Sequence, residues 1–317
     1  MLMDTVHYSV LQQEVLQYLV PPQGEGLFID CTLGEGGHSE LVLQENPGIN
    51  LVGLDADAHI LEIARQRLEP FKERVRLYNT WFNAFFREYP LGGERPDVIL
   101  FDLGISIFHY ERAGRGFSFQ KEEPLDMRLD TTLEISAYDI INTYPEKELA
   151  RIFFEYGEER YSRMIAASIV RERAKSSIET SAELAQLIKS SVPAKYRYGR
   201  IHPATRSFQA LRIMVNGELA RLESVLEDAL SVLKVGGRIG VISFHSLEDR
   251  IVKQFLQKKS QTCTCPPEWP ICKCGGQAVV KLIQKKPIQP SEDEVDKNAP
   301  SRSAKLRVAE KLMDEER

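Results

Sequence analysis

The chain has 317 residues, of which 43% are hydrophobic, so it can bury one large core or two smaller ones. Its formal net charge is −5, which excludes a basic protein overall and confines any nucleic-acid surface to a local patch. The N-terminus has no basic segment followed by an apolar one, and no apolar run is as long as a membrane span. We therefore expect a cytoplasmic protein without membrane contact.

The first third of the chain alternates apolar strands with helices. An amphipathic helix within 7–16 is expected first, and Pro21 and Pro22 end it. The predicted strands lie at 28–30, 50–55, 75–78 and 97–102, with helices at 38–44 and 59–68. The last of these strands is an apolar run of the kind that is buried on both faces. This alternation predicts an α/β fold with a doubly wound, Rossmann-like parallel sheet.

A glycine-rich turn joins the first strand to the next helix. Gly34, Gly36 and Gly37 follow the strand, and glycine lets the backbone approach a ligand and take positive φ values. The helix that follows directs free N–H groups toward such a ligand. Asp55 ends the second strand 21 residues after Gly34, a spacing at which a carboxylate reaches a ribose hydroxyl. The turn is therefore predicted to bind a nucleoside-type cofactor.

The details of the turn favour one cofactor. Ser39 stands where the dinucleotide pattern needs its third glycine, and no Gly-Lys-Ser/Thr follows, which argues against a P-loop. Asp30 enters the turn and Asp55 ends the next strand. S-adenosylmethionine, with ribose hydroxyls, an amino-acid tail and no pyrophosphate, suits this site best.

The strand pattern stops near residue 114 and resumes near residue 214. The predicted helices between these points lie at 137–142, 147–154, 162–174 and 181–190, with Thr180 or Ser181 as the cap of the last. A fifth strand is expected at 238–243, and segments 279–283 and 304–309 form a late hairpin. We therefore expect a cofactor-binding domain made of residues 1–113 and 214–317, with an inserted helical, substrate-binding domain at 114–213.

Charge within the insertion is uneven. The segment 184–217 contains no Asp or Glu, although the whole chain is acidic. Its cations alternate with rings, as in surfaces that bind phosphates and stack unpaired bases of single-stranded RNA. An ordinary solvated basic face is the alternative. The residues predicted to contact RNA are Arg197, Tyr198, Arg200, His202 and Arg206.

The five cysteines leave two alternatives open. Cys31 lies in the cofactor turn, where a thiolate could attack a pyrimidine ring, although a small buried residue is the simpler interpretation. The other four form two C-x-C pairs that could hold a structural Zn²⁺, although C-x-C is less diagnostic than C-x-x-C. These four are Cys263, Cys265, Cys272 and Cys274.

Several motifs together resemble one known family, the bacterial ribosomal RNA small subunit methyltransferase H family, also called MraW. The motifs are DCTLGEGGH at 30–38, RGFSF at 115–119, PLDMR at 124–128, IHPATRSFQALR at 201–212, SFHSLEDR at 243–250 and SAKLR at 303–307. The resemblance extends from residue 7 to the C-terminus. It implies a class I methyltransferase that uses S-adenosylmethionine to methylate the exocyclic N4 amine of one cytosine in the decoding region of 16S ribosomal RNA, within the 30S subunit.

The resemblance also assigns residues. With the turn glycines, it implies that His38, Asp55, Phe82 and Asp102 bind the cofactor. His109 stands where the family usually has a glutamine that contacts the cofactor, and an imidazole retains one hydrogen bond for that contact.

The chemistry of methyl transfer to a cytosine amine suggests three catalytic candidates. Asp102 can accept an N–H from the amine or hold the cofactor. His245 follows the fifth strand at the same edge, where it either contacts the base, takes up a proton or caps a helix. Asn216 is a further candidate for contacting the base.

Other functions remain to be weighed at this point. A non-catalytic RNA-binding ribosome assembly factor could hold the cofactor only for stability, and a methyltransferase could instead act on DNA or protein. A nicotinamide oxidoreductase on the same sheet is disfavoured by Ser39 and by the basic insertion. The oligomeric state stays open, with a homodimer among the alternatives.

Overall fold

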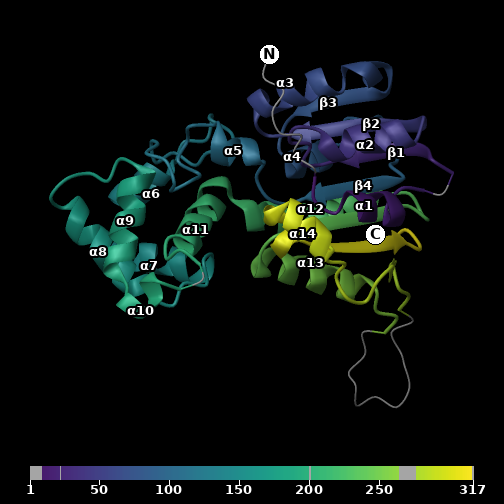
Figure 1. Cartoon of the computed structure of the whole chain (residues 1–317). Helices are drawn as coiled ribbons and strands as arrows, with labels where there is room; N and C mark the ends of the chain where they lie inside the picture. Colours follow the sequence, from purple (N-terminus) through teal and green to yellow (C-terminus); the bar gives the residue numbers. More distant parts are fainter. Residues whose placement is uncertain (1–8, 22, 200, 264–275, 316–317) are drawn as a thin grey trace, which may run out of the picture. The chain divides into compact units, whose positions relative to one another are not determined.

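The computed structural model describes residues 9–21, 23–199, 201–263 and 276–315 (Figure 1). The chain divides into two compact units, one made of residues 1–104 and 220–317 and the other of residues 105–219. We call them the sheet unit and the helical unit. The helical unit contains the whole expected insertion, 114–213, and extends beyond it at both ends.

A seven-stranded sheet forms the centre of the sheet unit, in the order β3-β2-β1-β4-β5-β7-β6 (Figure 1). The first five strands are parallel, and β7 pairs antiparallel with both β5 and β6. The predicted doubly wound sheet is confirmed, as is the antiparallel pairing of the two late segments. The strands are β1 Glu25–Asp30, β2 Gly48–Asp55, β3 Val75–Asn79, β4 Val98–Asp102, β5 Arg238–Ser243, β6 Val280–Leu282 and β7 Lys305–Lys311.

Helices cover both faces of this sheet because strand side chains alternate between the faces. Leu27 and Ile29 of β1 pack with α4, α12 and α13, whereas Phe28 packs with α1, α2 and α3. The helices of this unit are α1 Gln12–Tyr18, α2 Gly37–Glu45, α3 Ala58–Arg67, α4 Phe82–Glu88, α12 Glu218–Val232, α13 Ser246–Lys259 and α14 Glu292–Lys297, with 3₁₀ turns at Glu69–Arg74 and Ala299–Ser303. Among the described helices, none is long and apolar enough to cross a membrane.

The helical unit has a core of its own. Leu149, Phe153 and Ile165 are fully buried, or nearly so, where α7, α8 and α11 pack together. The predicted cap at Thr180 is confirmed, and it forms a capping box with Glu183. The helices are α5 Ile107–Glu111, α6 Ala137–Thr143, α7 Glu146–Glu155, α8 Ser162–Arg173, α9 Ser181–Ser191, α10 Ala194–Arg197 and α11 Thr205–Asn216.

Two cations hold the C-terminal end of α12 against the sheet. Lys311 is 2% exposed, and its ammonium donates to the carbonyls of Leu230, Ser231 and Leu233 at 2.6, 3.0 and 2.9 Å. Arg95 donates to carbonyls of the same turn. The last carbonyls of a helix have no partners within the helix, so the Lys311 side chain of β7 supplies hydrogen-bond donors to the end of α12.

An ion pair ties α13 to β7. Asp249 accepts from Arg307 at 2.7 Å and from Lys305 at 3.3 Å, and its side chain is 14% exposed. Burial alone would raise the pKa of this carboxyl, but the two cations outweigh that effect and hold the pKa below its usual value. The native state therefore releases this proton more readily than the unfolded chain does.

We expect Asp249→Asn to lower the free energy of unfolding at pH 7 by about 1.5–3 kcal/mol, the range for hydrogen bonds to charged groups. The stabilisation is fully present above the unfolded pKa, near 3.9, and is lost as the pH falls through the lower native pKa. Urea titrations at pH 7 and pH 3 measure the difference, with exposed Asp296→Asn as the control. A loss that is equal at both pH values would contradict this account.

Candidate functional site

The carboxyl ends of β2, β1, β4 and β5 lie side by side at one edge of the sheet. These strands are neighbours and parallel, so Asp55, Asp30, Asp102 and Ser243 end them at the same edge. Ligands of doubly wound sheets bind outside this edge. The fold therefore brings together the acidic residues that the sequence placed at strand ends.

The glycine turn adopts the backbone that its sequence predicts. Gly34 and Gly36 have φ angles of 54° and 81°, and Gly36 caps the start of α2 in the left-handed region. A side chain at Gly37 would place its Cβ 2.3 Å from the hydroxyl of Ser9. The turn thus requires glycine both for conformation and for close packing.

Buried polar groups line the turn. Asp30 is 1% exposed and accepts from the Ser39 hydroxyl at 2.7 Å and from the Thr32 N–H at 3.3 Å. Burial raises the pKa of Asp30, which these hydrogen bonds and nearby His38 only partly offset. Nε2 of His38 lies 3.4 Å from Oδ2 of Asp102. The side chains of Asp30, His38 and Asp102 therefore lie close together beside the glycine turn.

Several polar atoms of this cluster have unused hydrogen-bonding capacity. Among the described residues, Oδ1 of Asp102 and both ring nitrogens of His38 are buried without a hydrogen-bond partner. Buried polar atoms are normally satisfied, so their position beside the glycine turn fits a polar ligand that completes them. S-adenosylmethionine, with an amino group, a carboxylate and ribose hydroxyls, offers suitable partners.

Asp55 lies where a ribose would bind, but it also shapes the turn. Its carboxylate accepts from the N–H of Gly34 and from that of Asp57, both at 2.9 Å. A carboxylate has about four acceptor positions, so it can hold the turn and still accept from ribose hydroxyls. Asp55 therefore links the shape of the loop to its ligand.

Phe82 is more deeply buried than expected for a ring that stacks on the adenine of a cofactor. It begins α4, is 8% exposed, and contacts Phe101 edge to face at 5.5 Å. Neighbouring Trp81 is partly exposed, with the Arg221 guanidinium 3.9 Å from its ring centre. Phe82 is thus mainly a core residue, which can offer only its exposed edge to a ligand.

The cysteine alternatives have different outcomes. Cys31 is 2% exposed, and burial raises the pKa of its thiol well above the ordinary value, so a thiolate nucleophile is disfavoured. Cys263 is exposed, whereas Cys265, Cys272 and Cys274 lie outside the described residues. The zinc hypothesis therefore stays a prediction.

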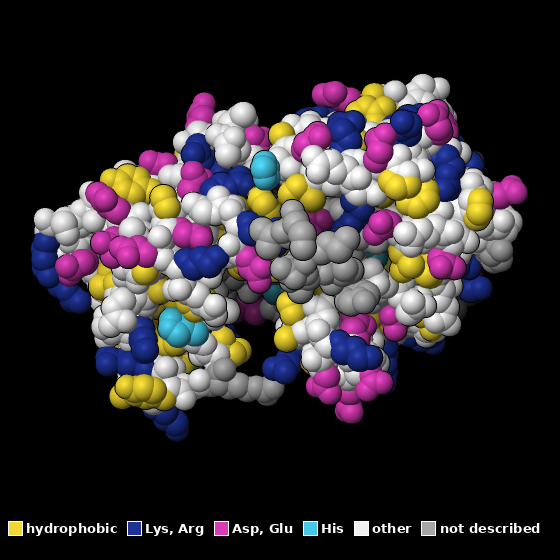
Figure 2. All heavy atoms as spheres, turned by 45° about the horizontal axis from the view of Figure 1, so that its top comes forward, with side chains coloured by type: hydrophobic (Ala, Val, Ile, Leu, Met, Phe, Trp, Pro, Cys, Tyr) yellow, Lys and Arg dark blue, Asp and Glu magenta, His cyan; other side chains and the backbone are white. Residues whose placement is uncertain are grey.

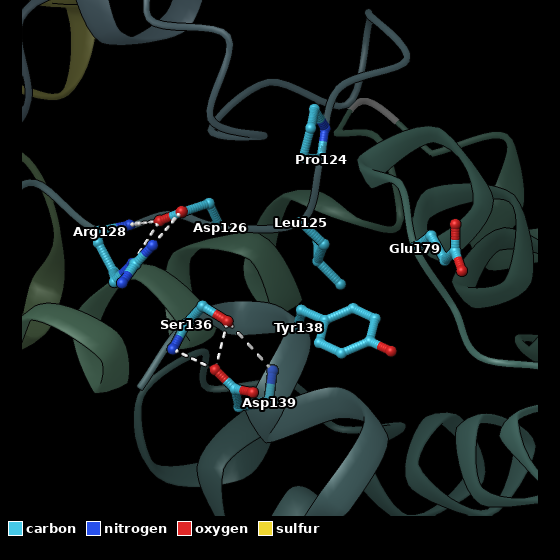
Figure 3. Close-up of a pocket in the computed structure, with 8 residues that line it drawn as sticks. All are labelled: Pro124, Leu125, Asp126, Arg128, Ser136, Tyr138, Asp139 and Glu179. Carbon is cyan, nitrogen blue, oxygen red and sulfur yellow. Dashed lines mark hydrogen bonds and ion pairs between the residues drawn. The ribbon is translucent and has the colours of Figure 1, made fainter. Parts of the chain in front are cut away.

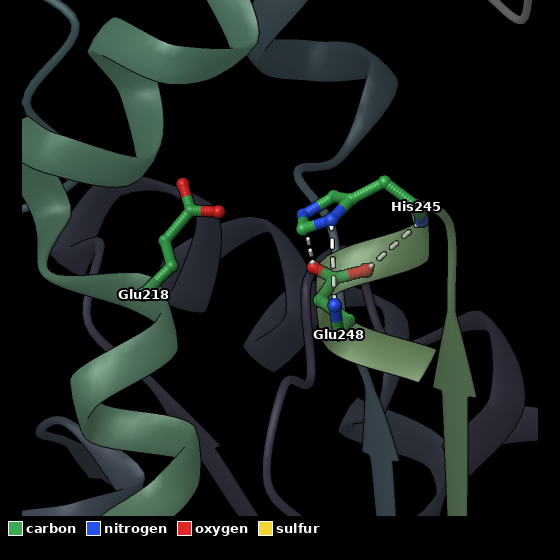
Figure 4. A group of neighbouring side chains, drawn as sticks. All are labelled: Glu218, His245 and Glu248. Atoms are coloured by element: carbon green, nitrogen blue, oxygen red, sulfur yellow. Dashed lines mark hydrogen bonds and ion pairs between the residues drawn. The ribbon is translucent and has the colours of Figure 1, made fainter. Parts of the chain in front are cut away.

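His245 caps a helix. It precedes α13, where its Nδ1 accepts from the N–H of Glu248 and its Nε2 lies 3.1 Å from the Glu248 carboxylate (Figure 4). The other oxygen of Glu248 accepts from the N–H of Phe244 at 2.8 Å. The side chain is 9% exposed. Capping, one of the roles weighed for this histidine, is the one that its geometry supports.

Two predicted site residues belong to the helical unit. Asn216 is 1% exposed, and its amide bonds to the backbone of Met127, Leu129 and Arg212. This places Asn216 in a structural role, because the atoms that would read a base are engaged inside the unit. His109 is 3% exposed and packs edge on against Phe117 at 5.4 Å.

The residues predicted to bind RNA take different positions. Tyr198 is 83% exposed and Arg206 is partly exposed, as an RNA surface requires. Arg197 donates to the carbonyls of Val192 and Ser190 and so caps the end of α9. Arg200 lies outside the described residues.

His202 is held within the helical unit. Its ring stacks on Phe119 at 4.6 Å. Burial and the nearby Lys189 charge lower the pKa of His202, so it is neutral at pH 7. A neutral, stacked imidazole offers no charge to a phosphate.

A polar pocket of about 280 Å³ opens in the helical unit (Figure 3). Within it Arg128 pairs with Asp126 at 2.7 Å, and the Asp139 carboxylate accepts from the N–H of Ser136 at 2.8 Å. The pocket is therefore a structural junction between the PLDMR segment and α6.

Sequence patterns missed two groups that the fold brings to functional positions. The Thr32 hydroxyl accepts from the N–H of Asp102 at 2.7 Å and so fixes β4 against the cofactor turn. Arg160 precedes α8 outside the acid-free segment, yet it packs on Tyr196 within that segment. Only tertiary structure connects these pairs.

The chain is similar to known methyltransferases over nearly its whole length. The profile of the MraW methylase family matches residues 4–312. Proteins named ribosomal RNA small subunit methyltransferase H from Treponema denticola and Brevibacillus brevis are 53% and 48% identical to it over 310 residues each. The alignments cover 98% and 96% of this chain and 98% of each relative. Because the family profile and these relatives match nearly the whole chain, the chain belongs to the MraW methylase family and is a methyltransferase.

Proposed function

We propose that the protein methylates the exocyclic N4 amine of one cytosine in the decoding region of 16S ribosomal RNA, and that it does so on the assembled 30S subunit in the cytoplasm. The observation that carries the proposal is Oδ1 of Asp102, buried without a hydrogen-bond partner among the described residues, beside the glycine turn. The relatives named as small-subunit RNA methyltransferases support the class of substrate.

Positioning accounts for most of the proposed catalysis. When bound, S-adenosylmethionine supplies an electrophilic methyl group on its sulfonium. The cytosine amine is a weak nucleophile because its lone pair is delocalised into the ring, so its alignment with the methyl group matters most. Asp102 accepts an amine N–H and thereby orients the nitrogen, and Thr32 fixes the backbone of Asp102. The amine must lose one proton when it gains the methyl group, and water or the Asp102 carboxylate would take up that proton.

The helical unit is the proposed RNA-binding part. Tyr198 provides an exposed ring for stacking on an unpaired base, and Arg206 provides a cation for a phosphate. Figure 2 shows Lys and Arg side chains on the part of the surface at the left of the view, which the helical unit forms, interspersed with hydrophobic side chains and with Asp and Glu side chains. Cations and rings together suit single-stranded RNA better than a duplex.

Nucleoside mass spectrometry tests the proposal directly. Unmodified 30S particles and naked 16S RNA are each incubated with the protein and isotope-labelled S-adenosylmethionine. We expect labelled N4-methylcytidine from the 30S particles and much less from the naked RNA. Labelled 5-methylcytidine, or no labelled nucleoside despite cofactor binding, would contradict the proposal, and the second outcome would favour an assembly factor.

A further inference from the structure

One arginine that no sequence pattern marked is supported by two rings. The guanidinium of Arg160 lies 4.9 Å from the ring centre of Tyr161 and 4.7 Å from that of Tyr196, and the two rings contact each other at 4.9 Å. Arg160 itself is exposed. A guanidinium that rests on aromatic rings keeps its orientation while its N–H groups remain available to an anion.

A buried carboxylate fixes this arrangement. Glu159 is 0% exposed, and its two oxygens accept from the Tyr196 hydroxyl at 2.7 Å and from the Tyr161 N–H at 2.8 Å. Burial and this hydrogen bond raise the pKa of Tyr196 to about 12, so the hydroxyl stays a donor at neutral pH. Glu159 thereby links the start of α8 to α10, and both rings are held beneath Arg160.

A second arginine reaches the same place from α11. Arg206 donates to the carbonyl of Glu158 at 3.2 Å. A side chain at Gly157 would place its Cβ 2.5 Å from the carbonyl oxygen of Arg206, so only glycine allows the loop to lie this close to α11. The charges of Arg206 and Arg160 both act on the Tyr196 hydroxyl. Loop 157–161 therefore brings together cations that lie 46 residues apart in the chain (206 − 160).

Neither guanidinium is held in an ion pair within the described part of the chain. The ion pairs formed there include neither Arg160 nor Arg206, whereas nearby Arg151 pairs with both Glu148 and Glu155. Tyr198, with its 83% exposed ring, follows two residues after Tyr196. Cations that are not engaged in ion pairs and lie near an exposed ring are suited to a phosphate and its adjoining base.

We propose that Arg160 and Arg206, supported by Tyr161 and Tyr196, form a phosphate-binding subsite for single-stranded RNA, with Tyr198 as the stacking ring for the adjacent base. The inference rests on the proposed RNA substrate and deepens it. Arg160 and Arg206 contact phosphate oxygens, whereas Glu159 is a positioning residue that acts through the two tyrosines.

Salt dependence of RNA binding tests the subsite. Fluorescence anisotropy with a labelled single-stranded fragment of 16S RNA is measured from 50 to 300 mM KCl. We expect Arg160→Ala to weaken binding and to make the slope of log affinity against log salt shallower by about 0.7, as for one lost phosphate contact on a single strand. Arg160→Ala combined with Arg206→Ala should lower the slope by about 1.4, twice that value.

Control variants separate the loss of a phosphate contact from a general loss of charge or of folding. Arg151→Ala removes an arginine that carboxylates already neutralise, so we expect no change in the slope. Arg160→Lys should keep the slope but bind more weakly, because the charge remains and the planar stacking is lost. Circular dichroism at each salt concentration checks that the variants are folded, and glutamine at the same position replaces alanine in any variant that is not.

The subsite is refuted if Arg160→Ala behaves like Arg151→Ala in both affinity and slope. The methylation of 30S particles by the unaltered protein would then still stand, so the two proposals fail separately. An acidic peptide is titrated in the same way. If Arg160→Ala weakens binding of the peptide but not of RNA, the subsite is likewise refuted and a protein partner is indicated.

Discussion

Asp102→Asn is expected to lower the rate of methyl transfer about a hundredfold while leaving the protein folded, a loss typical of removing one preorganised polar group from an active site. The substitution keeps the shape of the side chain but removes the charge that accepts from the amine and faces His38 at 3.4 Å. The hydrogen bond from the main-chain N–H of residue 102 to Thr32 does not involve the side chain and should persist. Release of S-adenosylhomocysteine in the presence of 30S particles measures the rate.

Two comparisons make the result specific. Glu45→Gln removes an exposed charge at the far end of α2 and should leave the rate unchanged. Calorimetric titration with S-adenosylmethionine then divides the effect between cofactor affinity and turnover. A rate within threefold of the unaltered protein would show that Asp102 has no part in the chemistry. Unfolding of Asp102→Asn would contradict the expectation that the side chain matters more for turnover than for folding.

The largest stability effect is expected from Lys311→Met, which should lower the free energy of unfolding of the sheet unit by about 3–5 kcal/mol. The substitution keeps most of the side-chain volume but removes all three hydrogen bonds to the end of α12 and the ion pair with Asp314 at 2.8 Å. The carbonyl of Leu230 loses the lysine donor that Arg95 does not replace. Trp81 belongs to the sheet unit, so its fluorescence in a guanidinium titration, measured in a Trp269→Phe background, follows the unfolding of that unit.

Lys281→Met is the matched control because that lysine is exposed on neighbouring β6. We expect it to change stability by less than about 0.5 kcal/mol, as for a surface substitution. If Lys311→Met is as stable as this control, Arg95 alone satisfies the helix end. Arg95→Met would then show the loss instead.

The sheet could be predicted because its signals are local. Apolar runs at 97–102 and 238–243 correspond to β4 and β5. The glycines of the turn are themselves the sign that its backbone takes positive φ angles. Asp30 and Asp102 reach one edge because parallel strands present their carboxyl ends together. Fold class and cofactor edge follow from patterns no longer than a few residues, combined with one topological rule.

The basic segment was harder to interpret because its cations serve several purposes. Its later part is the amphipathic helix α11, whose Phe208 and Leu211 are buried, and this helix was not predicted. Arg197 caps a helix, and Arg212 pairs with Glu218 at 2.8 Å, a partner just beyond the acid-free stretch. Charge along a sequence does not reveal which cations find partners in the fold, so the assignment of RNA-binding residues stays a prediction.

The position of β7 between β5 and β6 has a consequence for synthesis on the ribosome. Residues 105–219 are continuous, so they can collapse as soon as they have left the exit tunnel. The sheet, in contrast, can form completely only after Lys305–Lys311 has been synthesised, because this strand pairs with β5 and its Lys311 ammonium bonds to the end of α12. The newborn chain should therefore fold the helical unit, the proposed RNA-binding part, before the sheet unit, and activity should appear only after Lys305–Lys311 has left the exit tunnel.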